Sequence, residues 1–244
     1  MKNLTFIISA FILLTASCSK DSSESLSSDT GTGGSMACFT IMGNYLYTVD
    51  VNTLRIFDIQ IPAQPVLVGT KYVGINIETI FNNGNNLFIG SSNGIYILSV
   101  TNPVSPVIAA NYQHVQSCDP VIADTVNAWV TLNTNNEFCG NSVNELQVLN
   151  ISNIYSPYLV KRYTLTGPMG LAKNDSSLFV CDNGLKIFDC RNVSNLLLMQ
   201  HQSITAWDLI LNDTILIVTG PAGLTQYRLN GYGVDFLSSI SVNQ

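Results

Sequence analysis

Two carboxylic acids, Glu78 and Asp119, stand about forty residues apart at equivalent points of neighbouring segments of this 244-residue chain. Hydrolysis of a glycosidic bond requires such a pair, one acid to protonate the leaving group and one to act as base or nucleophile. No third polar group in the sequence completes an assignment of roles. We therefore favour acids that are solvated, or that bind a cation or a backbone amide, and assign no catalytic residue. A carbohydrate-active enzyme remains the alternative.

Other side chains that bear on chemistry are few. Trp207 offers an aromatic surface on which a sugar ring could stack, although an aromatic side chain more often fills a core. His114 lies close in sequence to Asp119, but a Ser-His-Asp or Cys-His site needs partners that converge in space, and a surface position is expected for it. Cysteines at Cys-x-x-Cys spacing are absent, so neither a metal nor a cofactor is expected.

The elements that must position these residues come from a repeat. The core Leu-Arg-Ile-Phe-Asp at residues 54–58 recurs in degraded form from Ile95, Leu146, Leu185 and Leu224, at steps of 41, 51, 39 and 39 residues. Each core, strand C, follows an aromatic and β-branched run, strand B, and a shorter run, strand A; strand D comes after it. A period near forty with four short strands predicts an all-β fold, a five-bladed β-propeller of four-stranded antiparallel blades.

We number the repeats as units one to five, at residues 36–71, 72–114, 115–164, 165–203 and 204–244. Strands B and C are apolar on both faces, as the neighbours Ile187 and Phe188 show, which indicates that each blade is sandwiched between two others. Asp58 and Asp189 end strand C and are expected to cap the turn that follows. No strand is exchanged between the ends of the ring. Closure should therefore rest on packing between units one and five, or on residues near Ser35.

Aligning the units from strand A to strand B without gaps places Glu78 and Asp119 at one position at the mouth of the central channel, with Trp207 one place further on. The B–C and D–A loops open on this face. Unit three carries about ten extra residues between strands B and C, at 133–143, and such an insertion is either a binding element or a neutral decoration. Its centre, Asn136, Glu137 and Phe138, joins the expected binding face, as does His114 near a D–A loop.

Cys118 precedes strand A of unit three and Cys139 lies in the inserted loop. In an oxidising compartment these two thiols are expected to form a disulfide that pins the loop. Cys38 is expected to be buried.

The cassette Gly-Leu-x-Ile-Phe-Asp followed by two prolines, read from residues 54–68 and 184–189, resembles the LVIVD repeat of bacterial and archaeal surface proteins. The resemblance covers residues 36–242, and units one and four match it best. It implies a β-propeller on the cell surface. The family carries no established catalytic residues, so none is transferred.

The first residues have the three regions of a secretory signal: Lys2, an apolar run at residues 4–14, and small residues that end at Cys18. This pattern resembles a bacterial lipobox, although Thr15 stands where leucine is usual. We expect a lipoprotein signal peptide at 1–17, a lipidated Cys18 within a flexible Ser/Gly-rich tether at 18–35, and the propeller at 36–244. Residues 19–24, with Lys20 followed by the acids Asp21 and Glu24, resemble the surface-export signal of Bacteroidota lipoproteins.

Composition limits the partners. Only 11% of the residues are charged against 46% apolar, and the formal net charge is −6, which argues against nucleic acid. The sequence thus predicts an outer-membrane lipoprotein, exposed at the cell surface or on the periplasmic side, that touches the membrane through its lipid anchor only. The expected role is non-catalytic binding of an envelope protein or a glycan. A purely structural envelope protein is the remaining alternative.

Overall fold

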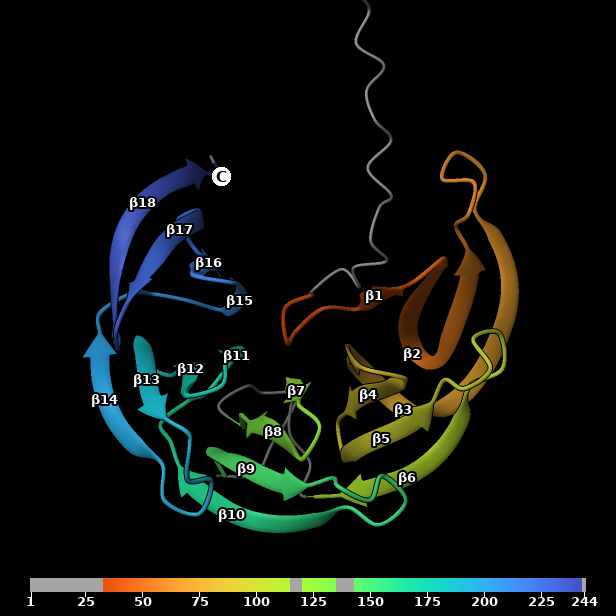
Figure 1. Cartoon of the computed structure of the whole chain (residues 1–244), viewed down its shortest axis with the longest axis horizontal. Helices are drawn as coiled ribbons and strands as arrows, with labels where there is room; N and C mark the ends of the chain where they lie inside the picture. The colour runs from red at the N-terminus through yellow and green to blue at the C-terminus, as the bar shows by residue number, and fades with distance from the viewer. Residues whose placement is uncertain (1–32, 115–119, 135–142, 243–244) are drawn as a thin grey trace, which may run out of the picture.

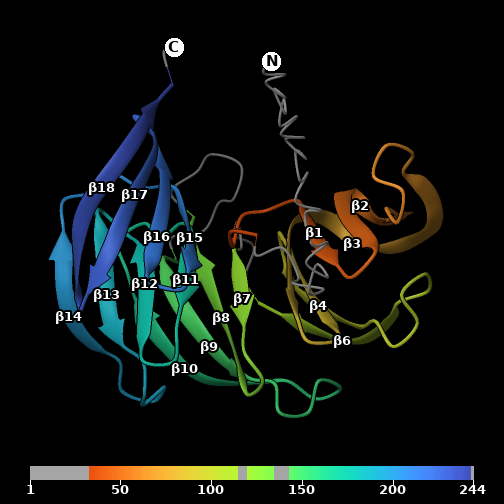
Figure 2. The same ribbon diagram turned by 45° about the horizontal axis from the view of Figure 1, so that its top comes forward.

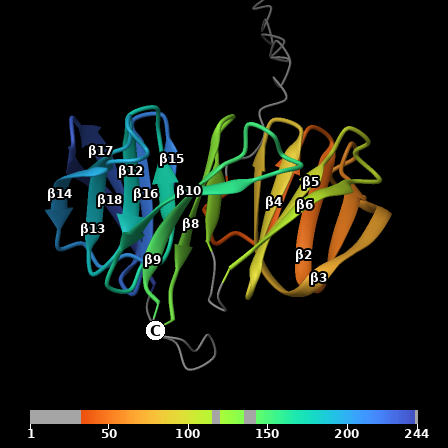
Figure 3. The same cartoon turned by 90° about the horizontal axis from the view of Figure 1, so that it is seen from below.

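The structure, a computed structural model, describes residues 33–114, 120–134 and 143–242, which form an all-β propeller of antiparallel sheets. Figure 1 shows the sheets arranged in an arc around a central axis, and Figure 3 shows the disc edge-on, with strands running from one face to the other. Within the described residues no helix is long and apolar enough to cross a membrane.

The first sheet has six strands in the order β1 to β6. Their bounds are β1 Phe39–Met42, β2 Tyr45–Asp58, β3 Val66–Asn83, β4 Asn86–Ser91, β5 Gly94–Ser99 and β6 Val107–Gln113.

The other three sheets have four strands each. They comprise β7 Val121–Ala123, β8 Asn127–Leu132, β9 Glu145–Asn150 and β10 Tyr158–Thr164; then β11 Leu171–Lys173, β12 Ser177–Cys181, β13 Leu185–Asp189 and β14 Leu197–Gln202; then β15 Asp208–Asn212, β16 Ile215–Gly220, β17 Gly223–Asn230 and β18 Gly233–Ser241.

The predicted count of five four-stranded blades is wrong, because the structure has four blades and the first is wider. Strand β2 includes both predicted strands B and C of unit one. The chain reverses direction at Val51 (φ 47°), and the Ile59 amide donates a hydrogen bond to the Asn44 carbonyl at 2.8 Å. Strand β3 runs from strand D of unit one into strand A of unit two, and Ile77 pairs with both Val51 and Ser91. Continuous pairing therefore merges the first two units into one sheet.

The expected packing of units face against face is present. Four apolar clusters each join two consecutive units: one with two, two with three, three with four, and four with five. Strand B is almost wholly buried in units two, three and four. Both faces of these strands are therefore covered, as the uninterrupted apolar runs predict.

The turns that follow strand C use side-chain caps. An Asp58 carboxylate oxygen accepts a bond from the Gln60 amide at 2.8 Å, and an Asp189 oxygen accepts one from the Arg191 amide at 3.1 Å. The Arg191 guanidinium also bonds to Asp189 and holds the pKa of that carboxyl well below its usual range. The capping role predicted for both aspartates is confirmed, since each accepts a backbone amide two residues later.

Replacing Ile187 by Asp should lower the free energy of unfolding by about 3 kcal/mol or more, because a carboxylate would enter a fully buried apolar layer without a partner. Denaturant unfolding measures the change. The same substitution at Val107, which is 61% exposed on the outer strand β6, serves as control and should have little effect. An Ile187→Asp variant as stable as the control would contradict the stacked arrangement.

Candidate functional site

A cleft of about 480 Å³ opens between units four and five on the face that carries the B–C and D–A loops. Trp207, 45% exposed, stands at its side. The lining side chains are apolar, hydroxyl, amide and imidazole groups, without a carboxylate, lysine or arginine: Met169, Asn183, Gly184, His201, Ser203, Thr205, Ala206 and Trp207. Such a cleft suits a ligand that is uncharged and rich in hydrogen-bonding groups.

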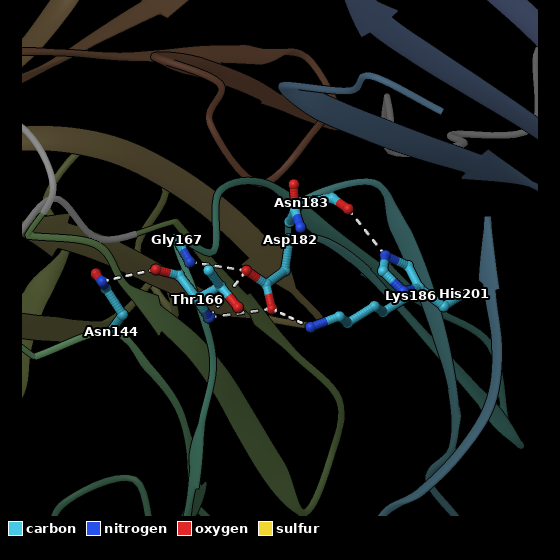
Figure 4. A network of polar contacts seen from close by, with 7 residues as sticks. All are labelled: Asn144, Thr166, Gly167, Asp182, Asn183, Lys186 and His201. Carbon is cyan, nitrogen blue, oxygen red and sulfur yellow. Dashed lines mark hydrogen bonds and ion pairs between the residues drawn. The ribbon is translucent and has the colours of Figure 1, made fainter. Parts of the chain in front are cut away.

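The wall of this cleft on the unit-four side is fixed by a buried carboxylate (Figure 4). Asp182, 1% exposed, accepts hydrogen bonds from the backbone amides of Thr166 at 3.0 Å and Gly167 at 2.8 Å, and it pairs with the Lys186 ammonium at 2.6 Å. The Asn144 side chain donates to the Thr166 carbonyl at 2.8 Å from unit three. These bonds hold the D–A loop against the B–C turn, so the cleft is built on a rigid frame.

His201 lies on the exposed side of the same frame. Its Nε2 is 2.8 Å from the carbonyl oxygen of Asn183, which has φ 49° in the B–C turn and is followed by Gly184 at φ 117°. Both residues have positive φ, which asparagine and glycine adopt more readily than other residues in a tight turn. The turn therefore presents the Asn183 side chain and the imidazole beside the cleft.

Of the predicted site residues that the structure describes, Trp207 alone lines the cleft. Glu78 is half-buried in β3, His114 is half-buried at the end of β6, and neither lines the Trp207 cleft. The His114 ring lies 6.4 Å from that of Tyr112, and its amide donates to the Asn93 carbonyl at 3.2 Å. Cys18, Cys118, Asp119, Asn136, Glu137, Phe138 and Cys139 lie outside the described residues.

The gapless alignment is off by one place in unit five. Strand pairing sets Thr79 opposite Gly90 and Asp208 opposite Thr219, so Asp208 and not Trp207 is the counterpart of Thr79. Asp208 stands 16 places before the repeat core at Leu224, as Thr79 stands 16 places before Ile95, so counting back from the core gives the same counterpart. Asp208 is the acid that the sequence reasoning missed. Cys38, expected to be buried, is exposed.

Asp208 is tied to the residues that lead into the first strand. Its two carboxylate oxygens accept bonds from the Ser35 hydroxyl at 2.8 Å and the Met36 amide at 3.1 Å. Gly34 and Gly170 leave room for it, since a Cβ on either glycine would lie about 2 Å from a carboxylate oxygen. Burial raises the pKa of Asp208, against these hydrogen bonds, which lower it. Because all its neighbours are structural, we assign Asp208 to closing the fold and not to catalysis.

The described residues offer little else for chemistry. No group of three or more His, Cys, Asp or Glu side chains within them could hold a metal ion. Burial raises the pKa of the Cys181 thiol, and the nearby Asp208 carboxylate adds to this, so the thiol is protonated and unreactive.

The comparisons with known proteins agree with this fold. The family profile described as "LVIVD repeat" matches residues 33–72, 79–114 and 138–165. The chain carries LVIVD repeats. No curated protein matches it.

Among solved structures, a protein of Lactobacillus plantarum aligns with a TM-score of 0.66 at 13% identity, over 82% of this chain and 69% of its own. The periplasmic gluconolactonase of Pseudomonas aeruginosa aligns with a TM-score of 0.62 at 13% identity, over 82% of this chain and 68% of its own. A Bacteroides uniformis protein provisionally assigned as a 6-phosphogluconolactonase aligns with a TM-score of 0.64 at 11% identity, over 84% of this chain and 70% of its own. At such identities the likeness establishes the propeller fold alone.

The raised pKa of Asp208 predicts a pH-dependent stability. A carboxyl whose folded-state pKa exceeds its ordinary 3.8 contributes stability that is fully present below that value and is lost as pH rises through the folded-state pKa. The Asp208→Asn variant lacks this titration. Its stability relative to the natural protein should therefore increase from pH 3 towards pH 7, measured by urea unfolding across the range. A difference that does not change with pH would contradict the assignment.

Proposed function

We propose that this LVIVD-repeat propeller is a non-catalytic binding module for a neutral glycan, which it holds in the cleft between units four and five. The observation that carries the proposal is the exposed indole of Trp207 beside uncharged polar groups. Sugar rings present C–H faces that pack on an aromatic ring, and hydroxyl groups that bond to amides, hydroxyls and imidazoles. Asn183, His201 and Ser203 supply such groups.

We further propose that the module is attached to the outer membrane through a lipid on Cys18 and is exposed at the cell surface. The support is the sequence pattern of residues 1–18 and the serine-rich stretch after it, which has the composition of a flexible tether. A tether of this kind lets a binding face turn towards glycans of the envelope or its surroundings. Mass spectrometry of the protein from its native host would reveal the lipid and its position.

A carbohydrate-active enzyme is the second candidate. It rests on Glu78 and Asp119, which the alignment of the repeats sets at equivalent positions, and proteins that share the fold include one named as a gluconolactonase. Against it, the Trp207 cleft contains no acid that could act on a bound sugar. Hydrolysis of sugar lactones or glycosides that disappears in a Glu78→Gln variant would favour the enzyme over the binding module.

Replacing Trp207 by Ala should weaken glycan binding about tenfold or more, which corresponds to roughly 1.4 kcal/mol of lost contact. Because the indole is exposed, the melting temperature should change little. A glycan array identifies the ligand, and calorimetry with that ligand measures the affinities of the natural and variant proteins.

Tyr155 provides a matched control, since it is 68% exposed in the C–D loop of unit three on the opposite face. The Tyr155→Ala variant should bind as the natural protein does. Equal binding by the Trp207 variant, or an array with no bound glycan, would overturn the proposal. Retention of a purified envelope protein in place of a glycan would assign the cleft to a protein ligand.

A further inference from the structure

A second cleft adjoins the Trp207 cleft on the same face of the molecule. Its volume is about 300 Å³, and it lies between the connection that follows β14 and the B–C turn of unit five, with Tyr227 in its lining. We call it the Tyr227 cleft. None of the described residues that line it is charged. Ser203 and Thr205 line both clefts, so the two meet along this connection.

The connection shared by the two clefts, residues 203–207, presents a row of side chains to solvent. Figures 1 and 2 show it running inward from the outer strand β14 to the inner strand β15. Ser203, Thr205 and Trp207 are exposed along it, whereas Ile204 and Ala206 pack on the apolar cluster that joins units four and five. Two hydroxyls and an indole therefore face outward at alternate positions of one segment, as side chains of an extended chain do.

Backbone contacts fix this row in place. The Trp207 amide donates to the Thr219 carbonyl of unit five, and the Trp207 carbonyl accepts from the Gly170 amide of unit four, each at 2.8 Å. A Cβ on Gly220 would lie 2.5 Å from the Thr205 carbonyl oxygen, so the B–C turn of unit five lies directly against the connection. The two clefts thus keep a fixed spacing, which lowers the entropic cost of binding a ligand that enters both.

The polar groups of the second cleft are available to a ligand. Within the part of the chain that the structure describes, the Ser203, Thr205 and Thr225 hydroxyls make no hydrogen bond to another residue. Burial raises the pKa of Tyr227, so its phenol keeps its proton and remains a donor. Each of these hydroxyls can both donate and accept, which matches the hydroxyl groups of a sugar.

We propose that the two clefts form one groove for a neutral oligosaccharide, with one sugar ring on Trp207 and a following ring in the Tyr227 cleft. The inference rests on the proposed glycan-binding function and names the class of glycan. From residue 203 to residue 207 the chain spans at most about 13 Å, at roughly 3.3 Å per residue, which is more than one sugar ring covers. Acidic sugars fit poorly, because a carboxylate would lose its hydration without gaining a charged partner.

Sugars of increasing length test the inference. The probes are neutral series of one to five sugar residues, namely cello-, manno- and N-acetylchito-oligosaccharides, first printed on the glycan array and then titrated into the full chain by calorimetry. In the series that binds, the dissociation constant should fall tenfold or more between one and three residues and then level off, because the groove ends at the B–C turn of unit five.

Variants separate the two clefts. Thr225→Val removes a hydroxyl from the Tyr227 cleft, and Ala222→Trp places an indole at its exposed edge. Each should reduce the gain in affinity with length at least threefold and leave single-sugar binding unchanged, whereas Trp207→Ala should weaken binding at every length. Thr214→Val, exposed in the A–B turn of unit five on the opposite face, is the matched control and should keep the full gain.

The outcomes distinguish this inference from the proposed function. Binding that depends on Trp207 but does not strengthen with length would overturn the longer groove and leave a site for a single sugar. A gain with length that survives both Tyr227-cleft variants would overturn it as well, since the additional rings would then lie elsewhere. Absence of binding in every series would overturn both proposals.

Discussion

The fold depends on covering both faces of strands B and C. In these strands apolar residues do not alternate with polar ones, as Ile187 and Phe188 illustrate, so a single sheet with one wet face would expose large apolar area. Stacking the units in an arc covers each face with the next unit, and the four apolar clusters are the result. In the end units buried residues alternate with partly exposed ones, and the outward face of unit five carries polar residues such as Gln226 and Arg228.

A short segment compensates in part for the open arc. Residues 33–37 reach from unit one across the channel and bond to units two, four and five through Ala37, Ser35 and Asp208. Burying the Asp208 carboxylate costs free energy, as its raised pKa indicates. It accepts hydrogen bonds from the Ser35 hydroxyl and the Met36 amide, which would otherwise lack this partner. The segment therefore links the inner strands of units that lie far apart in the sequence.

The residues that distinguish this propeller lie where the units differ. Turns after strand C are alike, with Asp58, Asn150 and Asp189 all accepting a backbone amide two residues on. On the opposite face, unit four alone among the described units carries the buried Asp182–Lys186 pair, and unit five carries Trp207. A common scaffold thus holds a local arrangement that only two units supply, which is the usual relation between repeats and their binding sites.

The sequence by itself determined the repeat, the four strands of each unit and the capped turns, because these depend on local periodicity and on residues a few places apart. It also indicated the face on which Trp207 lies. The merging of two units into one sheet required the tertiary structure, since the pairing of Ile77 with both Val51 and Ser91 joins strands that the repeat pattern treats as separate. The equivalence of Asp208 with Thr79 was available in the sequence, since both stand 16 places before the repeat core, at Leu224 and Ile95; the bonds that Asp208 accepts from Ser35 and Met36 required the tertiary structure. Whether the ends of the arc meet depends on the angle accumulated between stacked sheets, a quantity that no residue pattern within a unit encodes.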